Sequence, residues 1–211
     1  MSAKRTYVYI DGFNLYYGIL NQKRPGLKWL DLEGWLKKLL PPSQYDIRKI
    51  KFFTARVSAT PEDPDKPVRQ DIYFRALRTL PLVEIIEGSF LFKWIKIHVT
   101  KDVCVEARIA EEKGTDVNIA AHAINDAHKK LFDTAVIVSN DSDLAEVVRI
   151  LTQEMHLEAG IINPRQYGGF SQVLNKYSSF KKRARDNQIL TSQFPASLTD
   201  SVGTFTRPST W

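Results

Sequence analysis

Four aspartates stand where they could act together as ligands of a divalent metal ion: Asp11, Asp116, Asp141 and Asp143. Carboxylate oxygens are ligands that Mg²⁺ and Mn²⁺ prefer. Carboxylates that point into a cleft are costly unless a cation or a metal ion pairs with them. If the four side chains meet, the sequence therefore predicts a Mg²⁺ or Mn²⁺ site.

Three of these aspartates follow segments that resemble β-strands. Asp11 follows Thr6–Ile10, and Asp141 and Asp143 follow the apolar run Ala135–Val138, which is typical of a strand buried on both faces of a parallel sheet. In an α/β fold, ligands bind just beyond the carboxyl ends of the strands. If the two strands are neighbours, we expect their aspartates to share one crevice.

Helical periodicity gives a second reason to group the aspartates. Asp143 precedes Val147 by four residues, so it is expected to head the apolar stripe of its helix. Asp116 likewise leads a stripe of small side chains that includes Ala120 and Ala123. Taken singly, each aspartate has an ordinary explanation, because Asp is favoured at helix N-caps, in first helical turns and in turns with glycine. The coincidence of all four at one edge favours a metal site.

Five polar residues beside the aspartates could support such a site: Asn14, Lys113, Thr115, Ser139 and Asn140. Asn14 could hold a carboxylate or a substrate oxygen, while Ser139 and Asn140 could orient Asp141 or bind a phosphate. Thr115 is expected to be a helix N-cap, and Lys113 could contact a phosphate. Each also has a local alternative as a helix cap, a turn residue or a solvated lysine.

Strand and helix patterns alternate along the chain. The expected strands are Thr6–Ile10, Ile47–Val57, Val83–Phe90, Ala135–Val138 and Ala159–Ile162. The expected helices are Leu15–Leu20, Leu30–Leu40, Val68–Leu80, Thr115–Leu131, Leu144–Met155 and Phe170–Tyr177. This alternation predicts an α/β fold with a mostly parallel sheet that carries helices on both faces.

Two segments fall outside that alternation. Phe92–Ile109 alternates like a β-hairpin inserted into or added to the sheet, with Thr100-Lys101-Asp102 as its turn. From about Asn187 onward the sequence is polar and has little periodicity. We therefore expect one domain over residues 1–186 and an extended C-terminal tail over residues 187–211.

Composition narrows the class of protein. The chain has 211 residues, of which 43% are hydrophobic and 26% charged, as is usual for a globular protein. Its single cysteine, Cys104, excludes an intramolecular disulfide and fits a reducing compartment. The apolar runs are far shorter than the roughly 18 residues of a membrane span, and no signal-peptide segment precedes the first strand. We expect a cytoplasmic protein that does not associate with membranes.

The net charge of +6 is concentrated near the end of the expected domain. Residues 176–185 hold five basic side chains and no acidic one: Lys176, Lys181, Lys182, Arg183 and Arg185. A basic patch with interleaved aromatics attracts the phosphates of a nucleic acid. A solvated helix end that keeps the protein soluble is an equal alternative.

Three blocks around the aspartates carry a resemblance to a known family: Tyr9-Ile10-Asp11-Gly12-Phe13-Asn14-Leu15, Lys113-Gly114-Thr115-Asp116-Val117 and Val138-Ser139-Asn140-Asp141-Ser142-Asp143-Leu144. They resemble the signature blocks of NYN domains, which are PIN-like ribonucleases, here of the LabA-like group formerly called domain of unknown function 88. The resemblance spans roughly residues 5–180. It implies a PIN-like α/β/α sandwich, with the inserted hairpin outside the matching blocks.

The same resemblance implies roles for individual residues. Asp11, Asp116, Asp141 and Asp143 match an acidic quartet that binds Mg²⁺ or Mn²⁺ for cleavage of RNA, with Asn14 and Ser139 as supporting positions. One position departs from the family, because Asn140 stands where many relatives have glycine. Asparagine tolerates a positive φ better than most residues, so the turn is expected to survive.

Together these observations lead to the hypothesis of a metal-dependent ribonuclease, most simply an endonuclease, in which a metal-activated water attacks the phosphodiester. Asp11, Asp116 and Asp141 are the expected direct ligands, and Asp143 is a ligand or orients the others. Basic residues at the rim would hold the RNA backbone: Lys113, Arg149, Lys176, Lys181, Lys182, Arg183 and Arg185. Tyr16, Tyr17 and Trp94 could stack on bases, or lie in the core.

Other functions remain open or are disfavoured. A non-catalytic RNA-binding regulator with the same fold is the main alternative, and a homodimer is compatible with the sequence. A phosphatase-like domain that uses an aspartyl phosphate is ranked lowest, because Phe13 stands where a second aspartate would be needed. A structural zinc site is disfavoured by one cysteine and four scattered histidines, and the sequence contains no phosphate-binding loop and no dinucleotide fingerprint.

Overall fold

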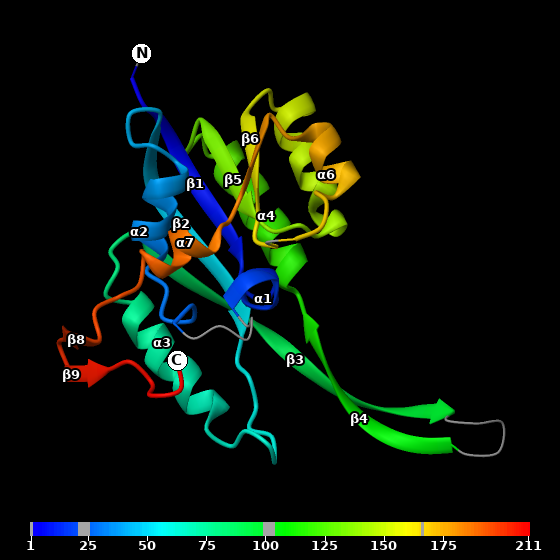
Figure 1. Cartoon of the computed structure of the whole chain (residues 1–211). Coiled ribbons are helices and arrows are strands. Elements are labelled where there is room, and N and C mark those ends of the chain that lie inside the picture. The colour runs from blue at the N-terminus through cyan, green and yellow to red at the C-terminus, as the bar shows by residue number, and fades with distance from the viewer. Residues whose placement is uncertain (1, 21–25, 99–103, 166) are drawn as a thin grey trace.

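The computed structural model describes residues 2–20, 26–98, 104–165 and 167–211. Seven strands of the described residues form one sheet in the order β4-β3-β2-β1-β5-β6-β7 (Figure 1). The strands are β1 (Lys4–Asp11), β2 (Tyr45–Ala55), β3 (Val83–His98), β4 (Cys104–Lys113), β5 (Thr134–Val138), β6 (Glu158–Asn163) and β7 (Phe180–Arg183). Every neighbouring pair is parallel except β3 and β4. The prediction of a mostly parallel α/β sheet is confirmed.

Helices cover both faces of this sheet. One face carries α4 (Thr115–His128), α5 (Ala145–Arg149) and α6 (Gln172–Tyr177), and the other carries α2 (Leu32–Leu39), α3 (Lys66–Leu77) and α7 (Asp186–Leu190) (Figure 1). Successive residues of a strand point to opposite faces. Val8 and Ile10 of β1 accordingly pack on the α2 and α3 side, while Tyr9 packs on the α4 side. The result is the predicted three-layer α/β/α sandwich.

A buried polar contact fixes α4 to the central strands. Lys51 of β2 donates to Asp126 of α4 at 2.5 Å, and the hydroxyl of Tyr9 donates to the same carboxylate oxygen at 2.9 Å. All three residues are buried. Removing one partner of such a pair would leave an uncompensated buried charge, so this contact holds α4, and with it Asp116 at the start of the helix, in register with the sheet.

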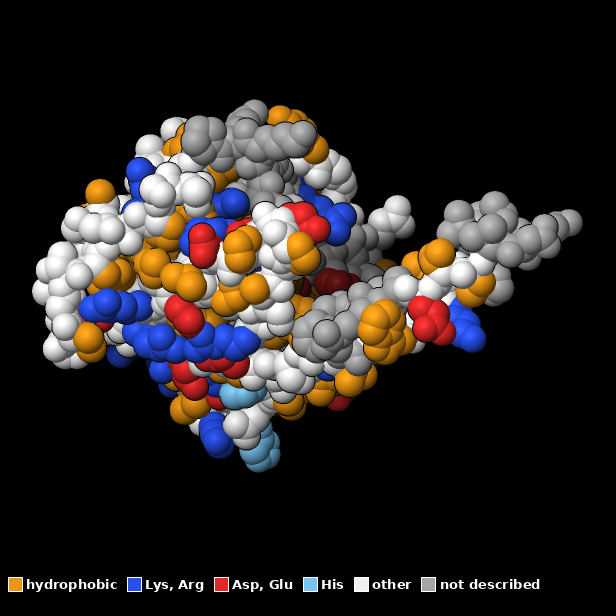
Figure 2. Space-filling view, turned by 90° about the horizontal axis from the view of Figure 1, so that it is seen from below, with side chains coloured by type: hydrophobic (Ala, Val, Ile, Leu, Met, Phe, Trp, Pro, Cys, Tyr) orange, Lys and Arg blue, Asp and Glu red, His pale blue; other side chains and the backbone are white. Residues whose placement is uncertain are grey.

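The inserted hairpin is a continuation of the sheet. Ser89–His98 of β3 pairs antiparallel with Cys104–Lys113, and the two strands project from the body as an arm (Figures 1 and 2). We expected a third strand over Val83–Phe90 and a separate hairpin from Phe92, whereas the structure runs them together as one strand of 16 residues. The expected turn, Thr100–Asp102, lies outside the described residues.

The C-terminal residues differ from the expected extended tail. They form α7 and then a two-stranded hairpin of β8 (Ser197–Asp200) and β9 (Gly203–Thr206). Arg75 of α3 binds Asp200 through two hydrogen bonds of 2.7 Å, and the ring of Trp211 lies 5.8 Å from that of Tyr73. A few apolar and charged anchors in a polar segment therefore suffice to fold it onto the body. The boundary of 1–186 for the domain stays a prediction.

Short irregular helices complete the chain. Gly12–Leu15 (α1) continues into a π-helical turn, η1 (Tyr16–Leu20), and α5 lies between a 3₁₀ turn, η2 (Ser142–Leu144), and a π-helical turn, η3 (Ile150–Glu154). The strand β7 was not expected, because its residues are mainly basic. Of the described helices, none combines the length and the apolar character that crossing a membrane would need.

Candidate active site

Asp11 ends β1 and lies under the start of α1. Its side chain is only 5% exposed, and it accepts hydrogen bonds from the backbone N–H of Asn14 at 2.8 Å and from the hydroxyl of Ser139 at 3.1 Å. A Cβ atom at Gly12 would lie 2.6 Å from the carbonyl oxygen of Phe53. Glycine is therefore required after Asp11, since it lets α1 begin directly against β2.

Asp141 is brought beside Asp11 by strand pairing. In the parallel pair of β1 and β5, Ile10 lies opposite Val138, so the residues that follow the two strands are adjacent. The hydroxyl of Ser139 accepts from the backbone N–H of Asp141 at 3.1 Å while it donates to the Asp11 carboxylate. One serine therefore links the two aspartates, as expected of an orienting residue.

Asp116 lies in the first turn of α4, as predicted, but the cap differs from the prediction. We expected Thr115 as the N-cap, whereas Gly114 occupies that position with a φ of 94°, and Thr115 is the first helical residue. Only glycine adopts that left-handed conformation without cost, and it turns the chain from β4 into α4. Thr115 and Asp116 then face the same cavity as Asp11.

A cavity of about 480 Å³ lies at this edge of the sheet. It is lined by Asp11, Phe13, Asn14, Tyr17, Gly18, Thr115, Asp116, Asp141, Arg165 and Tyr167. Three of the four predicted aspartates therefore share one space, in which the carboxyl ends of β1 and β5 meet the start of α4. This is the crevice that the strand order predicts.

Asp143 does not lie where it was predicted, at the head of the apolar stripe of its helix. Its side chain is exposed and is not among the residues that line the cavity. The prediction assumed a regular α-helix through Asp143, but Ser142–Leu144 forms a 3₁₀ turn, in which each residue advances further around the axis. The backbone N–H of Asp143 donates to the Asp141 carboxylate at 3.1 Å, and Asp141 is the N-cap of this turn.

The electrostatics of the cavity reflect three crowded carboxylates. Burial raises the pKa of Asp11 to about 6, and the negative charges of Asp116 and Asp141 contribute to the rise. The hydrogen bonds from Asn14 and Ser139 oppose this shift only in part. Asp116 and Asp141 therefore repel a charged Asp11, and a bound cation would relieve that repulsion.

The donor atoms suit a hard cation, although no metal centre is preformed. Among the described residues, no group of three or more His, Cys, Asp or Glu side chains has the arrangement of a metal centre. Asp11 and Asp141 accept hydrogen bonds from neutral donors, namely backbone amides and a serine hydroxyl. An all-oxygen set of carboxylates fits Mg²⁺ or Mn²⁺ by its chemistry.

Asn140 and Asn14 join the turn after β5 to its surroundings. Asn14 accepts from the backbone N–H of Asn140 at 3.1 Å, while the Asn140 side chain accepts from the N–H of Ser171 at 2.9 Å and donates to the carbonyl of Gly169 at 3.4 Å. We expected Asn140 to replace glycine through a positive φ, but it is not among the described residues with a positive φ. Its side chain instead fastens the loop after β6.

That loop contributes cavity residues that the sequence analysis missed. Arg165 and Tyr167 line the cavity, and Tyr167 is 70% exposed. Arg165 could have been found, because it follows the carboxyl end of β6 at the same edge of the sheet as Asp11 and Asp141. Tyr167 carries no comparable signal, since nothing in the local pattern indicates that the loop folds back over the site.

The basic cluster of residues 176–185 includes β7, so its side chains alternate between the two faces of the sheet. Arg183 donates to the carbonyls of Arg165 and Gly168, each at 2.8 Å, and lies over the ring of Phe170. Lys181 donates to Asn175 at 2.6 Å over the same ring. These two residues therefore support the cavity loop.

The remaining predicted basic residues lie in varied surroundings. Lys176 lies over the ring of Tyr177, Lys182 is partly buried, and Arg185 is exposed, as is Lys113 at the end of β4. Arg149 contacts Glu146 at 2.6 Å and Glu154 at 2.7 Å, so its charge is already compensated. Contact with RNA stays a prediction for all of them.

The three candidate stacking residues differ in exposure. Tyr17 is 64% exposed and lines the cavity, and its ring is stacked with that of Phe13 at a centroid distance of 6.5 Å. Trp94 is 68% exposed on the projecting arm. Tyr16 is partly buried and packs against the core. Tyr17 is therefore the candidate with both the exposure and the position.

The fold and the carboxylate cavity define a class of protein. The chain belongs to the NYN domain family, whose sequence profile matches residues 5–182, and the family implies a PIN-like, nuclease-type fold. This confirms the family indicated by the three blocks.

Two individual proteins are similar to this chain. The chain is 29% identical, over 98% of its own length and 75% of the relative's, to a protein of Pseudomonas putida (strain DSM 28022 / S16) named 6-hydroxy-3-succinoylpyridine 3-monooxygenase HspA. A crystal structure of VPA0982, a protein of unknown function from Vibrio parahaemolyticus RIMD 2210633, matches with a TM-score of 0.58 and 17% identity. That match covers 88% of this chain and 95% of the other, and it supports the fold alone.

Proposed function

We propose that this protein is a Mg²⁺- or Mn²⁺-dependent ribonuclease that cleaves RNA endonucleolytically. The observation that carries the proposal is the shared cavity of Asp11, Asp116 and Asp141, in which burial and two neighbouring carboxylates raise the pKa of Asp11 to about 6. A buried carboxylate beside like charges is costly to ionise unless a cation compensates it. Membership of the NYN family supports the nuclease class.

The carboxylates of the first cavity would be the metal ligands, and neighbouring groups would position them. Asp11, Asp116 and Asp141 would hold the metal, which when bound would activate water and stabilise the charge that develops on the phosphate. Ser139 links the carboxylate of Asp11 to the backbone N–H of Asp141. Asp143 positions Asp141 through its backbone N–H rather than by its carboxylate.

Other residues of the cavity would hold the substrate. Arg165 reaches the cavity from the loop after β6 and would contact a phosphate oxygen. Tyr17 and Tyr167 are exposed rings on separate segments of the rim, and each could stack on an unpaired base. A single strand of RNA therefore fits these surroundings better than a duplex, in which the bases are not available for stacking.

The test is cleavage of a circular single-stranded RNA and of a structured RNA by the purified protein. A circle has no ends, so only an endonuclease converts it to a linear product. We expect cleavage with Mn²⁺, none with excess EDTA, and none with Asp141→Asn, while Asp143→Asn keeps most of the activity. Absence of cleavage with either metal, or activity that is indifferent to Asp141→Asn, would contradict the proposal.

The main competitor is an RNA-binding regulator without catalysis. It predicts RNA binding that falls steeply with salt, needs no metal and survives Asp116→Asn. The ribonuclease proposal predicts instead that Asp116→Asn abolishes cleavage and removes any stimulation of RNA binding by Mn²⁺. A filter-binding series at several salt concentrations, with and without metal, separates the two.

A second candidate function follows from the similarity to the Pseudomonas protein, which extends over 98% of this chain. It is the activity stated in that protein's name, under which this chain would consume 6-hydroxy-3-succinoylpyridine in the presence of dioxygen and a reductant. Loss of that compound, abolished by Asp141→Asn, would favour the second candidate. RNA cleavage without any loss of the compound would favour the first.

A further inference from the structure

A second cavity of about 360 Å³ lies next to the carboxylate cavity. Phe13 and Tyr17 line both spaces and form the wall between them. The far walls of the second cavity come from the end of β2, the start of α3 and the C-terminal Trp211. A chain that passes through the first cavity can therefore continue over the shared aromatic wall into the second.

The apolar part of the second cavity is made largely of aromatic rings, including those of Tyr16, Phe52, Tyr73 and Trp211. The hydroxyl of Tyr73 already donates to the carbonyl of Leu30 at 2.9 Å, so this residue offers its ring rather than a polar group. Flat heteroaromatic ligands bind such surroundings by stacking and edge contacts. The cavity therefore fits a planar ring.

The polar part of the second cavity is positively charged. Among the described residues that line it, Lys28, Lys66 and Arg69 stand with one acidic side chain, that of Asp63, which is paired with Arg69. Burial lowers the pKa of Lys28, and the neighbouring charge of Arg69 lowers it further. The ammonium of Lys28 lies 5.7 Å from the centroid of the Tyr16 ring. An anionic group on a ligand would compensate the excess of cations.

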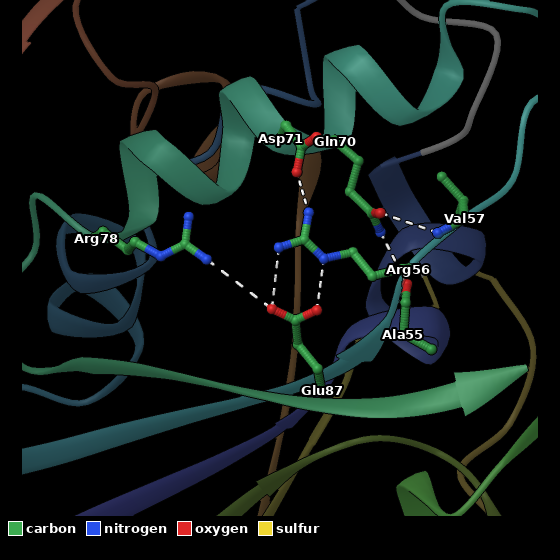
Figure 3. Close-up of polar contacts among 7 residues, drawn as sticks. All are labelled: Ala55, Arg56, Val57, Gln70, Asp71, Arg78 and Glu87. Carbon is green, nitrogen blue, oxygen red and sulfur yellow. Dashed lines mark hydrogen bonds and ion pairs between the residues drawn. The ribbon is translucent and has the colours of Figure 1, made fainter. Parts of the chain in front are cut away.

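The wall of the cavity between β2 and α3 is preformed. The side-chain amide of Gln70 donates to the carbonyl of Ala55 at 2.9 Å and accepts from the N–H of Val57 at 3.0 Å (Figure 3). In the same region Arg56 bridges Asp71 of α3 and Glu87 of β3. A ligand would therefore meet a fixed wall, which reduces the ordering cost of binding.

We propose that the second cavity is a subsite for one nucleotide unit of the RNA substrate, with the base among the rings and a phosphate at Lys28, beside the Arg69–Asp63 pair. This inference rests on the proposed function, because it places the unit next to the phosphodiester held at the carboxylates. A planar heteroaromatic ring that carries an anion is also the chemistry of 6-hydroxy-3-succinoylpyridine, named for the Pseudomonas relative. The experiment must therefore separate a nucleotide from such a compound.

The direct test is calorimetric binding of uridine and adenosine monophosphate to the metal-free protein. We expect Lys28→Met to weaken binding by about tenfold, as for loss of a charged contact, and Lys28→Arg to restore most of it. The matched control is Lys129→Met, since Lys129 lies at the far end of α4, about 20 Å along the helix from Asp116. That control should stay within about twofold of the unaltered protein.

The ligand series defines which parts of the nucleotide matter. Uridine and adenosine without phosphate, and inorganic phosphate alone, should each bind about tenfold more weakly than the monophosphates, because each satisfies only one half of the cavity. Tighter binding of 6-hydroxy-3-succinoylpyridine than of either nucleotide would overturn the assignment to RNA. Nucleotide binding that is equal in Lys28→Met, with the variant folded by circular dichroism, would overturn the subsite.

One further variant separates this inference from the proposed function. Asp141→Asn should abolish cleavage and leave binding of the monophosphates unchanged, because Asp141 lines only the first cavity. Nucleotide binding that depends on Lys28, in a protein that cleaves no RNA, would support the subsite and overturn catalysis. In an active protein, Lys28→Met should raise KM about tenfold with kcat nearly unchanged, and a change confined to kcat would overturn the subsite.

Discussion

The two neighbouring cavities share a wall but have opposite charge. Among the described lining residues, the first brings together three acidic side chains with one arginine, Arg165, whereas the second brings together three basic side chains with one acidic side chain, Asp63. In the first, burial and like charges raise the pKa of an acid, and in the second they lower the pKa of a partly buried lysine. The lining of the first cavity is therefore mainly acidic, and that of the second mainly basic.

The contrast indicates what kind of ligand could satisfy both spaces at once. Cations would compensate the first cavity and anions the second, and the rings of Phe13 and Tyr17 between them offer an apolar surface. A nucleic acid strand with a bound divalent ion supplies all three groups: metal charge, phosphate charge and flat bases. We therefore expect substitutions in the two cavities to affect different steps.

The largest expected effect is the loss of cleavage on neutralising a carboxylate of the first cavity. Asp141→Asn removes one of the three carboxylates proposed to hold the metal, and should therefore lower kcat by about 100-fold or more. Asp143→Asn should lower it by less than about twofold, because the proposed contribution of Asp143 is a backbone N–H that the substitution retains. Single-turnover rates at saturating Mn²⁺ measure both. An equal loss of kcat in Asp141→Asn and Asp143→Asn would contradict the different roles proposed for the two side chains.

The next largest effect is on the free energy of unfolding, and its sign differs between a buried aspartate of the first cavity and a surface aspartate. The pKa of Asp11 is raised from 3.8 to about 6 in the folded protein. Between these two pH values the folded state therefore holds a proton on Asp11 that the unfolded state has released, and this proton stabilises the folded state. The stabilisation is lost as the pH rises through about 6. At pH 7.5 the metal-free protein therefore bears the cost of a buried charge. Asp11→Asn should raise the free energy of unfolding by about 1–3 kcal/mol there, and by little near pH 4.

A surface aspartate provides the matched control for this measurement. Hydrogen bonds from Arg5 lower the pKa of Asp133, so Asp133→Asn should destabilise the protein slightly at pH 7.5, which is the opposite sign. Denaturant unfolding without metal at the two pH values gives both differences. Saturating Mn²⁺ should reverse the order of the unaltered protein and Asp11→Asn. Destabilisation by Asp11→Asn at pH 7.5 without metal would contradict the electrostatic account of the cavity.

A smaller effect is expected at the wall that the cavities share. Tyr17→Ala removes an exposed ring, so it should leave stability almost unchanged while it raises KM for a single-stranded RNA about five- to tenfold. It should also weaken binding of uridine monophosphate. Trp94→Ala is the matched control, since Trp94 is similarly exposed but lies on the arm. An equal rise in KM for Trp94→Ala would mean that the RNA contacts the arm as strongly as the wall.

The two cavities also differ in how far the sequence predicts them. The first is formed by positions that follow regular elements, so strand order and the signature blocks are sufficient to bring Asp11, Asp116 and Asp141 together. Even here the predicted phase of Asp143 is wrong, because a 3₁₀ turn replaces the regular helix. Local irregularity of that kind leaves no clear mark on a hydrophobic pattern.

The second cavity could not be predicted, because residues of irregular segments complete a lining to which α3 contributes only Lys66, Arg69 and a few neighbours. Lys28 and Asp63 lie in loops, and Trp211 belongs to a segment whose polar composition suggested an extended tail. Tertiary contacts such as those of Trp211 with Trp29 and Tyr73 decide their positions. Periodicity gives information on neighbours along an element, and it gives none on contacts between loops that are far apart in the chain.

The smallest effect is expected where this chain departs from its family. Asn140→Gly introduces the glycine that the resemblance implies at this position, but it removes the hydrogen bonds to Gly169 and Ser171 that fasten the loop carrying Arg165 and Tyr167. We expect the free energy of unfolding to fall by about 1 kcal/mol and KM for RNA to rise about two- to fivefold. Effects of this size are expected for the loss of one or two hydrogen bonds at the edge of a site.

Hydrogen exchange measures the cause of that change directly. The backbone N–H of Ser171 should lose protection in Asn140→Gly, whereas the N–H of Asn14, bonded to Asp11, should exchange as before. Asn140→Asp is the intermediate variant, since it retains the acceptor for Ser171 and loses the donor to Gly169. Unchanged protection of Ser171 in Asn140→Gly would mean that Asn163 and Arg183, which also bind this loop, are sufficient to hold it against the first cavity.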